Sequence, residues 1–283
     1  MSMDTKQKFG GQWTVEKLNI LSQYLDSYST ALKNKNFELM YIDAFAGTGK
    51  INIGDDDYSE TIDGSARLAL RSHGNFSKYI FIEKKKAFAN ELKAMIHNEF
   101  PEKEEKVSVV ERDCNDVLNL LCRNTVWDSK RALLFLDPYA ADVKWDTLRE
   151  IANTHAIDVW YLFPFSAASR MLKKNGNIDA KWRDKLNSIF GDNSWENELY
   201  VPNDQLSFFE EEDDSKIKIA DKEMLKKYIE KRLGTVFPKV SPNSRILYNK
   251  KHSPLFLFCF AVSNASPKAY GLAMRMADYI LKN

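Results

Sequence analysis

Four short apolar runs in the first half of the chain each end on an acidic residue, and this repeated pattern constrains the fold most strongly. The runs cover residues 39–43, 79–83, 107–113 and 131–137, and stretches with helical spacing of apolar residues lie between them. Runs that are apolar throughout are typical of strands buried on both faces. Strands that alternate with helices form parallel sheets covered by helices on both sides. The sequence therefore predicts an α/β fold in which four acids meet at the carboxyl edge of one sheet.

Three further apolar runs, at 158–165, 245–248 and 255–262, raise the predicted number of strands to seven. The last two lie close together and predict an antiparallel hairpin that closes the sheet, before a final helix over about 268–281. An amphipathic helix over 14–34, which we expect to cover the core, precedes the first strand. We therefore expect one Rossmann-like domain over the whole chain, with a mostly parallel seven-stranded sheet and helices on both faces.

Two stretches interrupt the alternation of strands and helices. Residues 52–63 are polar and acidic, and we expect them to form a mobile loop. Residues 168–243 are long and mixed in charge, with helix-like pieces around 179–190 and 221–233. We interpret 168–243 as a helical subdomain, inserted before the last strands, that recognises a substrate or a partner.

The charge of the chain is balanced, with 41 Lys and Arg residues against 40 Asp and Glu residues. A balanced chain has no long-range field that attracts polyanions, so any contact with nucleic acid must be local. Residues 170–185 carry a local excess of positive charge around Trp182. This stretch is either a solvated helix face, which we favour, or a contact with nucleic acid.

We expect a cytoplasmic protein without a metal centre. The apolar runs are shorter than the roughly 18 residues that cross a membrane, and residues 1–11 lack the apolar region of a signal peptide. Cys114, Cys122 and Cys259 are odd in number and lack a metal-binding spacing, so we interpret them as buried or spectator thiols. The four histidines are scattered along the chain and predict no metal site.

The first strand ends at Asp43 and is followed by a tight turn that contains Gly47 and Gly49. Missing side chains in such a turn let the backbone approach a ligand closely, although glycine turns after strands are also common structural devices. The sequence Phe-Ala-Gly-Thr-Gly, which begins at Phe45, resembles the first motif of nucleic-acid methyltransferases. That resemblance implies that Asp43, Phe45, Gly47 and Gly49 bind S-adenosylmethionine (SAM), with the turn around its methionine part.

Residues 47–50 are also similar to a phosphate-binding loop, but the similarity fails at two positions. The phosphate-loop pattern needs a glycine at Ala44 and a hydroxyl residue at Ile51. Without the hydroxyl there is no magnesium ligand, so the sequence argues against nucleotide hydrolysis.

Glu83 and Asp113 end the second and third apolar runs. A carboxylate at the tip of the second strand can accept hydrogen bonds from both ribose hydroxyls of SAM, and Asp113 is placed to accept one from the adenine amino group. Each acid has a structural alternative. Glu83 could cap a helix, and either Asp113 or Asn115 could do the same without binding a ligand.

The fourth run ends at Asp137, and Pro138 and Tyr139 follow directly. This triplet resembles the [DNS]-P-P-[YFW] motif of amino-methyltransferases, in which the acid and a proline carbonyl hold the target amino group while the aromatic ring stacks on a flipped base. One proline is missing here, so the ring stands one residue nearer to the acid. The resemblance implies that these three residues are catalytic, and a purely structural Asp-Pro turn is the alternative.

In combination, these motifs resemble the three-Cys-motif partner proteins, over roughly the first 165 residues. Such proteins are similar to class I methyltransferases and associate with a partner that bears three clustered cysteines and is itself similar to radical SAM enzymes. Ala140 stands where we expect the glycine of a D-P-Y-G motif in the family. Its methyl group narrows the loop after Tyr139, which affects the substrate side of the site more than the cofactor side. The resembling segments are residues 13–18, 24–25, 41–49, 63–65, 81–83 and 135–139, followed by Val143 and Trp145.

The sequence thus supports two hypotheses from different classes. The first is a SAM-dependent methyltransferase that acts on an amino group of a nucleobase. The second is a non-catalytic, methyltransferase-like binding module that serves the three-cysteine partner, because fold does not dictate function.

Overall fold

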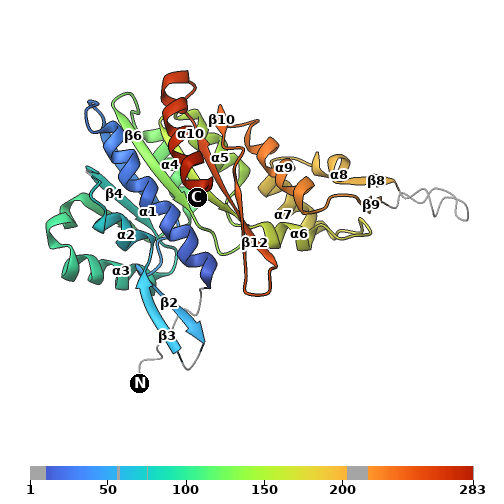
Figure 1. Ribbon diagram of the computed structural model, residues 1–283, viewed down its shortest axis with the longest axis horizontal. Coiled ribbons are helices and arrows are strands. Elements are labelled where there is room, and N and C mark those ends of the chain that lie inside the picture. The colour runs from blue at the N-terminus through green and yellow to red at the C-terminus, as the bar shows by residue number, and fades with distance from the viewer. Residues whose placement is uncertain (1–10, 56–57, 75, 203–215, 283) are drawn as a thin grey trace, which may run out of the picture.

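One large sheet forms the centre of the protein (Figure 1). The computed structural model describes residues 11–55, 58–74, 76–202 and 216–282. Strands pair in the order β10-β12-β7-β6-β1-β4-β5, and β11 pairs with the first half of β12 on the edge that faces away from β7. The strands are β1 (Glu38–Asp43), β4 (Lys78–Ile82), β5 (Val107–Val110), β6 (Lys130–Leu136), β7 (Ile157–Phe163), β10 (Lys239–Val240), β11 (Arg245–Tyr248) and β12 (Pro254–Val262).

The five strands from β7 to β5 are parallel, and β12 runs antiparallel to β7. Both faces of the sheet are buried. Successive side chains of a strand point to opposite faces, so each strand contributes to a core on both sides. In β1, Met40 and Ile42 belong to the core on one face, and Leu39 and Tyr41 belong to the core on the other. The sheet is mostly parallel and lies between helices, which is the Rossmann-like α/β arrangement that the sequence predicts.

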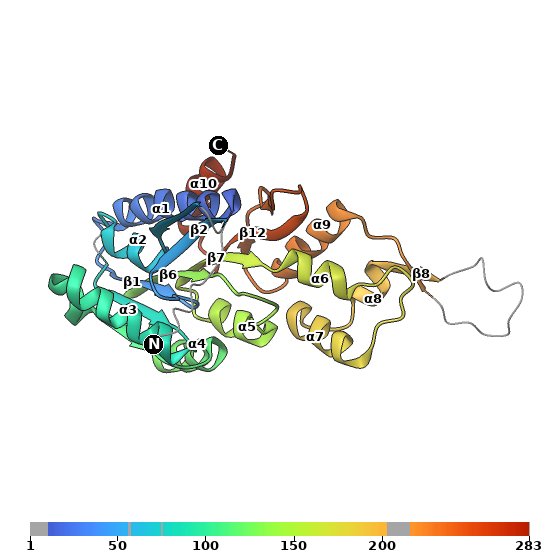
Figure 2. The ribbon, with the colours of Figure 1, turned by 90° about the horizontal axis from the view of Figure 1, so that it is seen from below.

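Helices cover the two faces of the sheet in separate groups (Figure 2). The first group consists of α1 (Gln12–Leu32), α2 (Ser65–Arg71), α3 (Lys86–Glu99) and α10 (Pro267–Lys282), and the 3₁₀ helix η1 (Pro101–Lys106) follows α3. These helices share one hydrophobic core, in which α1 packs against α2 and α10. The second group contains α4 (Cys114–Asn124) and α5 (Trp145–Asn153). All three cysteines are buried, as the sequence predicts. Across the described residues, each helix is too short or too polar to cross a membrane.

Two expectations about strands are wrong. Within the described residues, the main sheet has eight strands instead of seven, because β10 has only two residues and gives no periodic signal. The expected mobile loop at 52–63 is also wrong, since the described part of this segment belongs to an antiparallel hairpin of β2 (Lys50–Asp55) and β3 (Tyr58–Asp63). A separate two-stranded ribbon needs no apolar run, which explains why its polar sequence predicts a loop.

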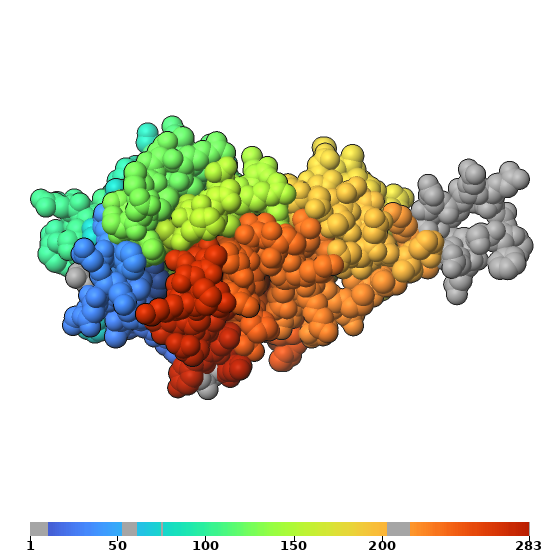
Figure 3. All heavy atoms as spheres, turned by 90° about the horizontal axis from the view of Figure 1, so that it is seen from above, coloured from blue at the N-terminus to red at the C-terminus, as the bar shows by residue number. Residues whose placement is uncertain are grey.

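The described residues of the 168–243 stretch (168–202 and 216–243) pack against β7 and β12 and lie toward one end of the described chain (Figure 3). The helix-like pieces expected at 179–190 and 221–233 correspond to α7 (Ala180–Phe190) and α9 (Lys222–Leu233). The Phe163 ring at the end of β7 stacks on Phe190 of α7, with ring centroids 5.8 Å apart. A role in recognition stays a prediction, and residues 203–215 lie outside the described part. The elements are α6 (Phe165–Met171), α7 (Ala180–Phe190), α8 (Trp195–Glu198), β8 (Tyr200–Pro202), β9 (Lys216–Lys218) and α9 (Lys222–Leu233).

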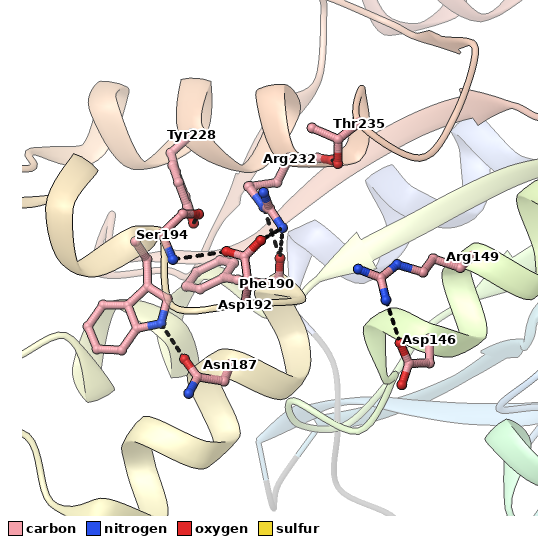
Figure 4. A network of polar contacts seen from close by, with 10 residues as sticks. Asp146, Arg149, Asn187, Phe190, Asp192, Ser194, Tyr228, Arg232 and Thr235 are labelled. Carbon is pink, nitrogen blue, oxygen red and sulfur yellow. Dashed lines mark hydrogen bonds and ion pairs between the residues drawn. The ribbon is translucent and has the colours of Figure 1, made fainter.

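Arg232 of α9 ties the end of α7 to the rest of the insertion (Figure 4). Its Nε and one terminal nitrogen donate to the Phe190 carbonyl oxygen at 2.9 and 2.7 Å, and that nitrogen also donates to Asp192 at 2.7 Å. The guanidinium lies 5.2 Å from the centroid of the Trp145 ring on α5. One side chain therefore joins three segments of the second face.

We expect Arg232→Met to lower the free energy of unfolding by about 1 to 3 kcal/mol, because a buried carbonyl and a carboxylate lose their donors. Urea denaturation of the full chain measures this. Lys231→Met is the matched control, since Lys231 is exposed and pairs with Glu198 at the surface. Equal effects of the two substitutions would contradict the role of Arg232.

Candidate functional site

A cavity of about 320 Å³ lies at the carboxyl edge of the sheet. Because β1 and β6 are adjacent parallel strands, the loops that follow them meet at this edge. The volume falls within the range of roughly 300–1,000 Å³ that is usual for small-molecule sites. The cavity is lined by residues 45–51 of the glycine turn, by Gly64 and Ser65, by Asp137, Pro138 and Tyr139, by Trp13, Thr14 and Lys17 of α1, and by Leu255 and Phe256 of β12.

The two glycines of the turn serve different purposes. Both have positive φ, +59° at Gly47 and +79° at Gly49, a conformation that glycine adopts without strain. A Cβ on Gly49 would lie 2.6 Å from Cε of Met95, so a side chain there would force the Met95 side chain of α3 to move. The Gly49 carbonyl also accepts from the N–H of Gly64 at 2.9 Å, which closes the base of the β2–β3 hairpin. Gly49 is therefore explained by packing as well as by its place in the cavity wall.

Glu83 lies behind the turn and holds its backbone. One carboxylate oxygen accepts from the N–H of Gly47 at 3.1 Å, and the other accepts from the N–H of Lys85 at 2.7 Å. The residue is buried, and it is not among the residues that line the cavity. Its observed contacts thus organise the glycine turn, and the predicted contact with ribose stays a prediction.

Asp43 is fully buried beneath the same turn. Its Oδ1 accepts from the N–H of Phe45 at 3.1 Å. Burial raises the pKa of this carboxyl to about 7, against the lowering effects of the Ser65 hydroxyl and the Phe45 N–H. Ser65 lines the cavity, whereas Asp43 itself is separated from it.

Asp113 caps α4, as the structural alternative proposes. Its Oδ1 accepts from the N–H of Asn115 at 3.0 Å, and its Oδ2 lies 3.2 Å from Nζ of Lys84. Burial raises the pKa of Asp113, but the Asn115 hydrogen bonds and the Lys84 ammonium outweigh it and hold the pKa below its usual value. Asn115 in turn accepts from the N–H of Lys144 and the Thr147 hydroxyl, both at 2.9 Å, so it joins α4 to α5.

Of the four acids at strand ends, Asp137 lines the described cavity, and it forms an ion pair with Lys17 of α1. The Lys17 side chain is 5% exposed, and its Nζ lies 4.9 Å from the centroid of the Trp13 ring. Tyr139, two residues after Asp137, is 47% exposed and lies under the ammonium of Lys85 at 5.6 Å. The cavity therefore contains a buried lysine paired with a partly buried carboxylate, beside an accessible aromatic ring.

The sequence identifies α1 as a covering helix but misses its part in the site. Trp13, Thr14 and Lys17 all line the cavity, and the Trp13 ring packs against Phe256 of β12 with centroids 5.0 Å apart. The hydroxyl oxygen of Thr14 is buried without a hydrogen-bond partner among the described residues. The only sequence signal for this role is the spacing of these three residues, which places them on one face of a helix.

No family model matches the sequence, and no curated protein matches it. Among solved structures, the chain is similar to a Legionella pneumophila protein of the family DUF519, with 11% identity and a TM-score of 0.48, over 93% of this chain and 91% of that one. It is also similar to the methyltransferase domain of bacterial CtHen1-C, with 10% identity and a TM-score of 0.41, over 86% and 99% of the two chains. Spermidine synthase from Thermotoga maritima gives 10% identity and a TM-score of 0.43, over 90% and 62%. Ligand and substrate have to be inferred from the residues of this chain.

The buried carboxyl of Asp43 predicts a pH-dependent stability. Its pKa is about 7 in the folded protein against an ordinary value of 3.8. The stability that the protonated carboxyl contributes to the folded state is therefore fully present below pH 4 and is lost as the pH rises through 7. Asp43→Asn keeps an acceptor for the N–H of Phe45 and removes the titration. The free energy of unfolding of the variant minus that of wild type should therefore increase from pH 5 to pH 8, by up to ~3 kcal/mol. Urea denaturation at both pH values measures this, and a difference that does not change with pH would contradict it.

Proposed function

We propose that this protein transfers a methyl group from SAM to an amino group of a nucleobase in nucleic acid. The observation that carries this proposal is the meeting of the glycine turn and the Asp137-Pro138-Tyr139 loop in one cavity. A transferase needs its donor and its acceptor side by side, because most of its work is positioning. We also expect the protein to act in the cytoplasm.

On the cofactor side, the residues present fit the methionine part of SAM. Phe45, Gly47 and Gly49 form a cavity wall of backbone that bends at positive φ, and the Thr14 hydroxyl beside it is buried without a partner among the described residues. When bound, the cofactor supplies the electrophilic methyl group. We assign Glu83 to the ribose and Asp113 to the adenine, since both stand at the same edge of the sheet. Asp43 then supports the turn from below.

On the acceptor side, Tyr139 presents an accessible ring at the cavity, and an aromatic ring stacks on any base. The Oδ2 of Asp137 is engaged by Lys17, which leaves Oδ1 for a substrate amino group. An exocyclic amine on a base is a poor nucleophile. A hydrogen bond from that amine to Oδ1, with the Pro138 carbonyl beside it, would localise the nitrogen lone pair for transfer.

Two observations favour the second hypothesis, a non-catalytic binding module. The ion pair with Lys17 occupies part of Asp137, and the motif has one proline where amino-methyltransferases have two. Under this alternative the protein binds a partner with three clustered cysteines, as the resemblance to the three-Cys-motif partner proteins implies. The insertion at 168–243 would then be the surface for that partner.

Binding of SAM separates the proposal from a module that binds no cofactor. A ligand that binds only the folded state raises the melting temperature by mass action. We expect S-adenosylmethionine and S-adenosylhomocysteine at millimolar concentration to raise it. If neither changes the melting temperature, the cofactor assignment is wrong.

Gly47→Val should abolish SAM binding with a modest loss of stability, because the side chain would enter the cavity and oppose a positive φ. Gly49→Val is a useful comparison, since its side chain would also meet Met95 and Leu92 in the core. It should lower stability more strongly. Calorimetry with S-adenosylhomocysteine and urea denaturation measure the two effects, and retained binding by Gly47→Val would remove the glycine turn from the site.

Asp137→Ala should remove methyl transfer while changing SAM affinity little, because it deletes the oxygen that would accept from the substrate amine, and Tyr139→Ala should weaken acceptor binding by about 1 to 3 kcal/mol. The measurement is transfer of labelled methyl groups to cellular RNA, DNA and protein, with and without cell extract as a source of partners. Asp146→Ala, at an exposed acid on α5, is the control. Label in protein alone would overturn the nucleobase, equal label from wild type and Asp137→Ala would clear Asp137, and no label in any fraction would favour the binding module.

A further inference from the structure

Lys17 is a buried cation with two observed partners, the Asp137 carboxylate and the Trp13 ring, whose centroid lies 4.9 Å from Nζ. An ammonium group has three N–H donors, and Asp137 is the oxygen acceptor observed among the described residues. The side chain is 5% exposed and lines the cavity. Donors that are removed from water without an oxygen acceptor are costly, so Lys17 favours a further anionic or carbonyl acceptor inside the cavity.

The surroundings of Lys17 narrow the kind of ligand. Thr14 stands one helical turn before Lys17 on the same face of α1, and its buried hydroxyl has no hydrogen-bond partner among the described residues. Lys50, another cation that lines the cavity, has a half-exposed side chain whose Nζ lies 3.6 Å from Glu99. Solvent and Glu99 therefore weaken the charge of Lys50, whereas Lys17 and Thr14 form a shielded pair of donors suited to a carboxylate.

We propose that Lys17 and the Thr14 hydroxyl bind the carboxylate of the methionine part of SAM, while Lys17 continues to donate to Asp137. This inference rests on the proposed function, because it requires SAM in this cavity. The glycine turn lines the same cavity, so donors from α1 and backbone from the turn would hold the same end of the cofactor. Lys17 would then be a positioning residue for Asp137 as well, since it joins the cofactor to the acceptor loop.

A different role for Lys17 is neutralisation of Asp137 alone. Buried ion pairs of this kind contribute little net stability, and an uncharged pair of similar volume can replace them. The two roles make different predictions for ligands that differ only in the carboxylate-bearing part. S-adenosylhomocysteine carries that part, whereas 5′-methylthioadenosine keeps the adenosine and the thioether but has no amino acid group.

Calorimetry on the purified full chain tests the inference with these two ligands. We expect Lys17→Met to weaken binding of S-adenosylhomocysteine by about tenfold to a hundredfold, the effect of losing a charged hydrogen bond. Binding of 5′-methylthioadenosine should stay the same. Lys130→Met is the matched control, because Lys130 also pairs with an acid, Glu38 at 2.5 Å, at the opposite edge of the sheet. It should change neither affinity.

Lys17→Met leaves Asp137 without its cation and could unfold, so the double variant Lys17→Met/Asp137→Asn is measured beside it. The inference is supported if the double variant also loses affinity for S-adenosylhomocysteine but not for 5′-methylthioadenosine. Wild-type affinity for both ligands, or an equal loss for both, overturns it. A wild-type protein that binds neither ligand is a different result, because that outcome refutes the proposed function itself.

Discussion

The pairing of β1 with β6 fixes where the site lies. Asp43 is opposite Phe135 in the register, and the N–H of Ala44 donates to the Phe135 carbonyl at 3.0 Å. The glycine turn and the acceptor loop therefore leave adjacent strands at the same edge of the sheet. Ala46 continues this anchoring on the other side, where its N–H donates to the Ile82 carbonyl of β4 at 3.0 Å. The turn is thus held by both neighbouring strands before any ligand contact is considered.

Three of the four acids at or near strand ends, all but Asp137, accept hydrogen bonds from backbone N–H groups of the loops at this edge of the sheet. Asp43 accepts from Phe45, Glu83 accepts from Gly47 and Lys85, and Asp113 accepts from Asn115. A loop that turns away from a strand leaves N–H groups without sheet partners, and a nearby carboxylate satisfies them. The pattern of acid-tipped strands consequently predicts an ordered sheet edge more directly than it predicts ligand contacts.

The parts of the fold that the sequence predicts are those with a strong local signal. Continuous apolar runs identify the central strands, and helical spacing identifies α1, α7 and α9. The hairpin of β2 and β3 carries no such signal because it is polar, and β10 has two residues. Lys17 is missed for another reason. Its contact with Asp137 spans 120 residues, and a lysine on an amphipathic helix is ordinarily taken as part of the solvated face.

The position of Lys17 follows from the packing of the helix that carries it. Leu21, Tyr24 and Leu25 of α1 are fully buried in the core beside the sheet, so the helix cannot shift without exposing them. Tyr24 also packs edge-on against Trp160 of β7, with ring centroids 5.3 Å apart. These contacts hold the N-terminal end of α1 against the cavity, so the core packing and not a ligand fixes the position of Lys17. A covering helix and a wall of the site are, in this protein, the same element.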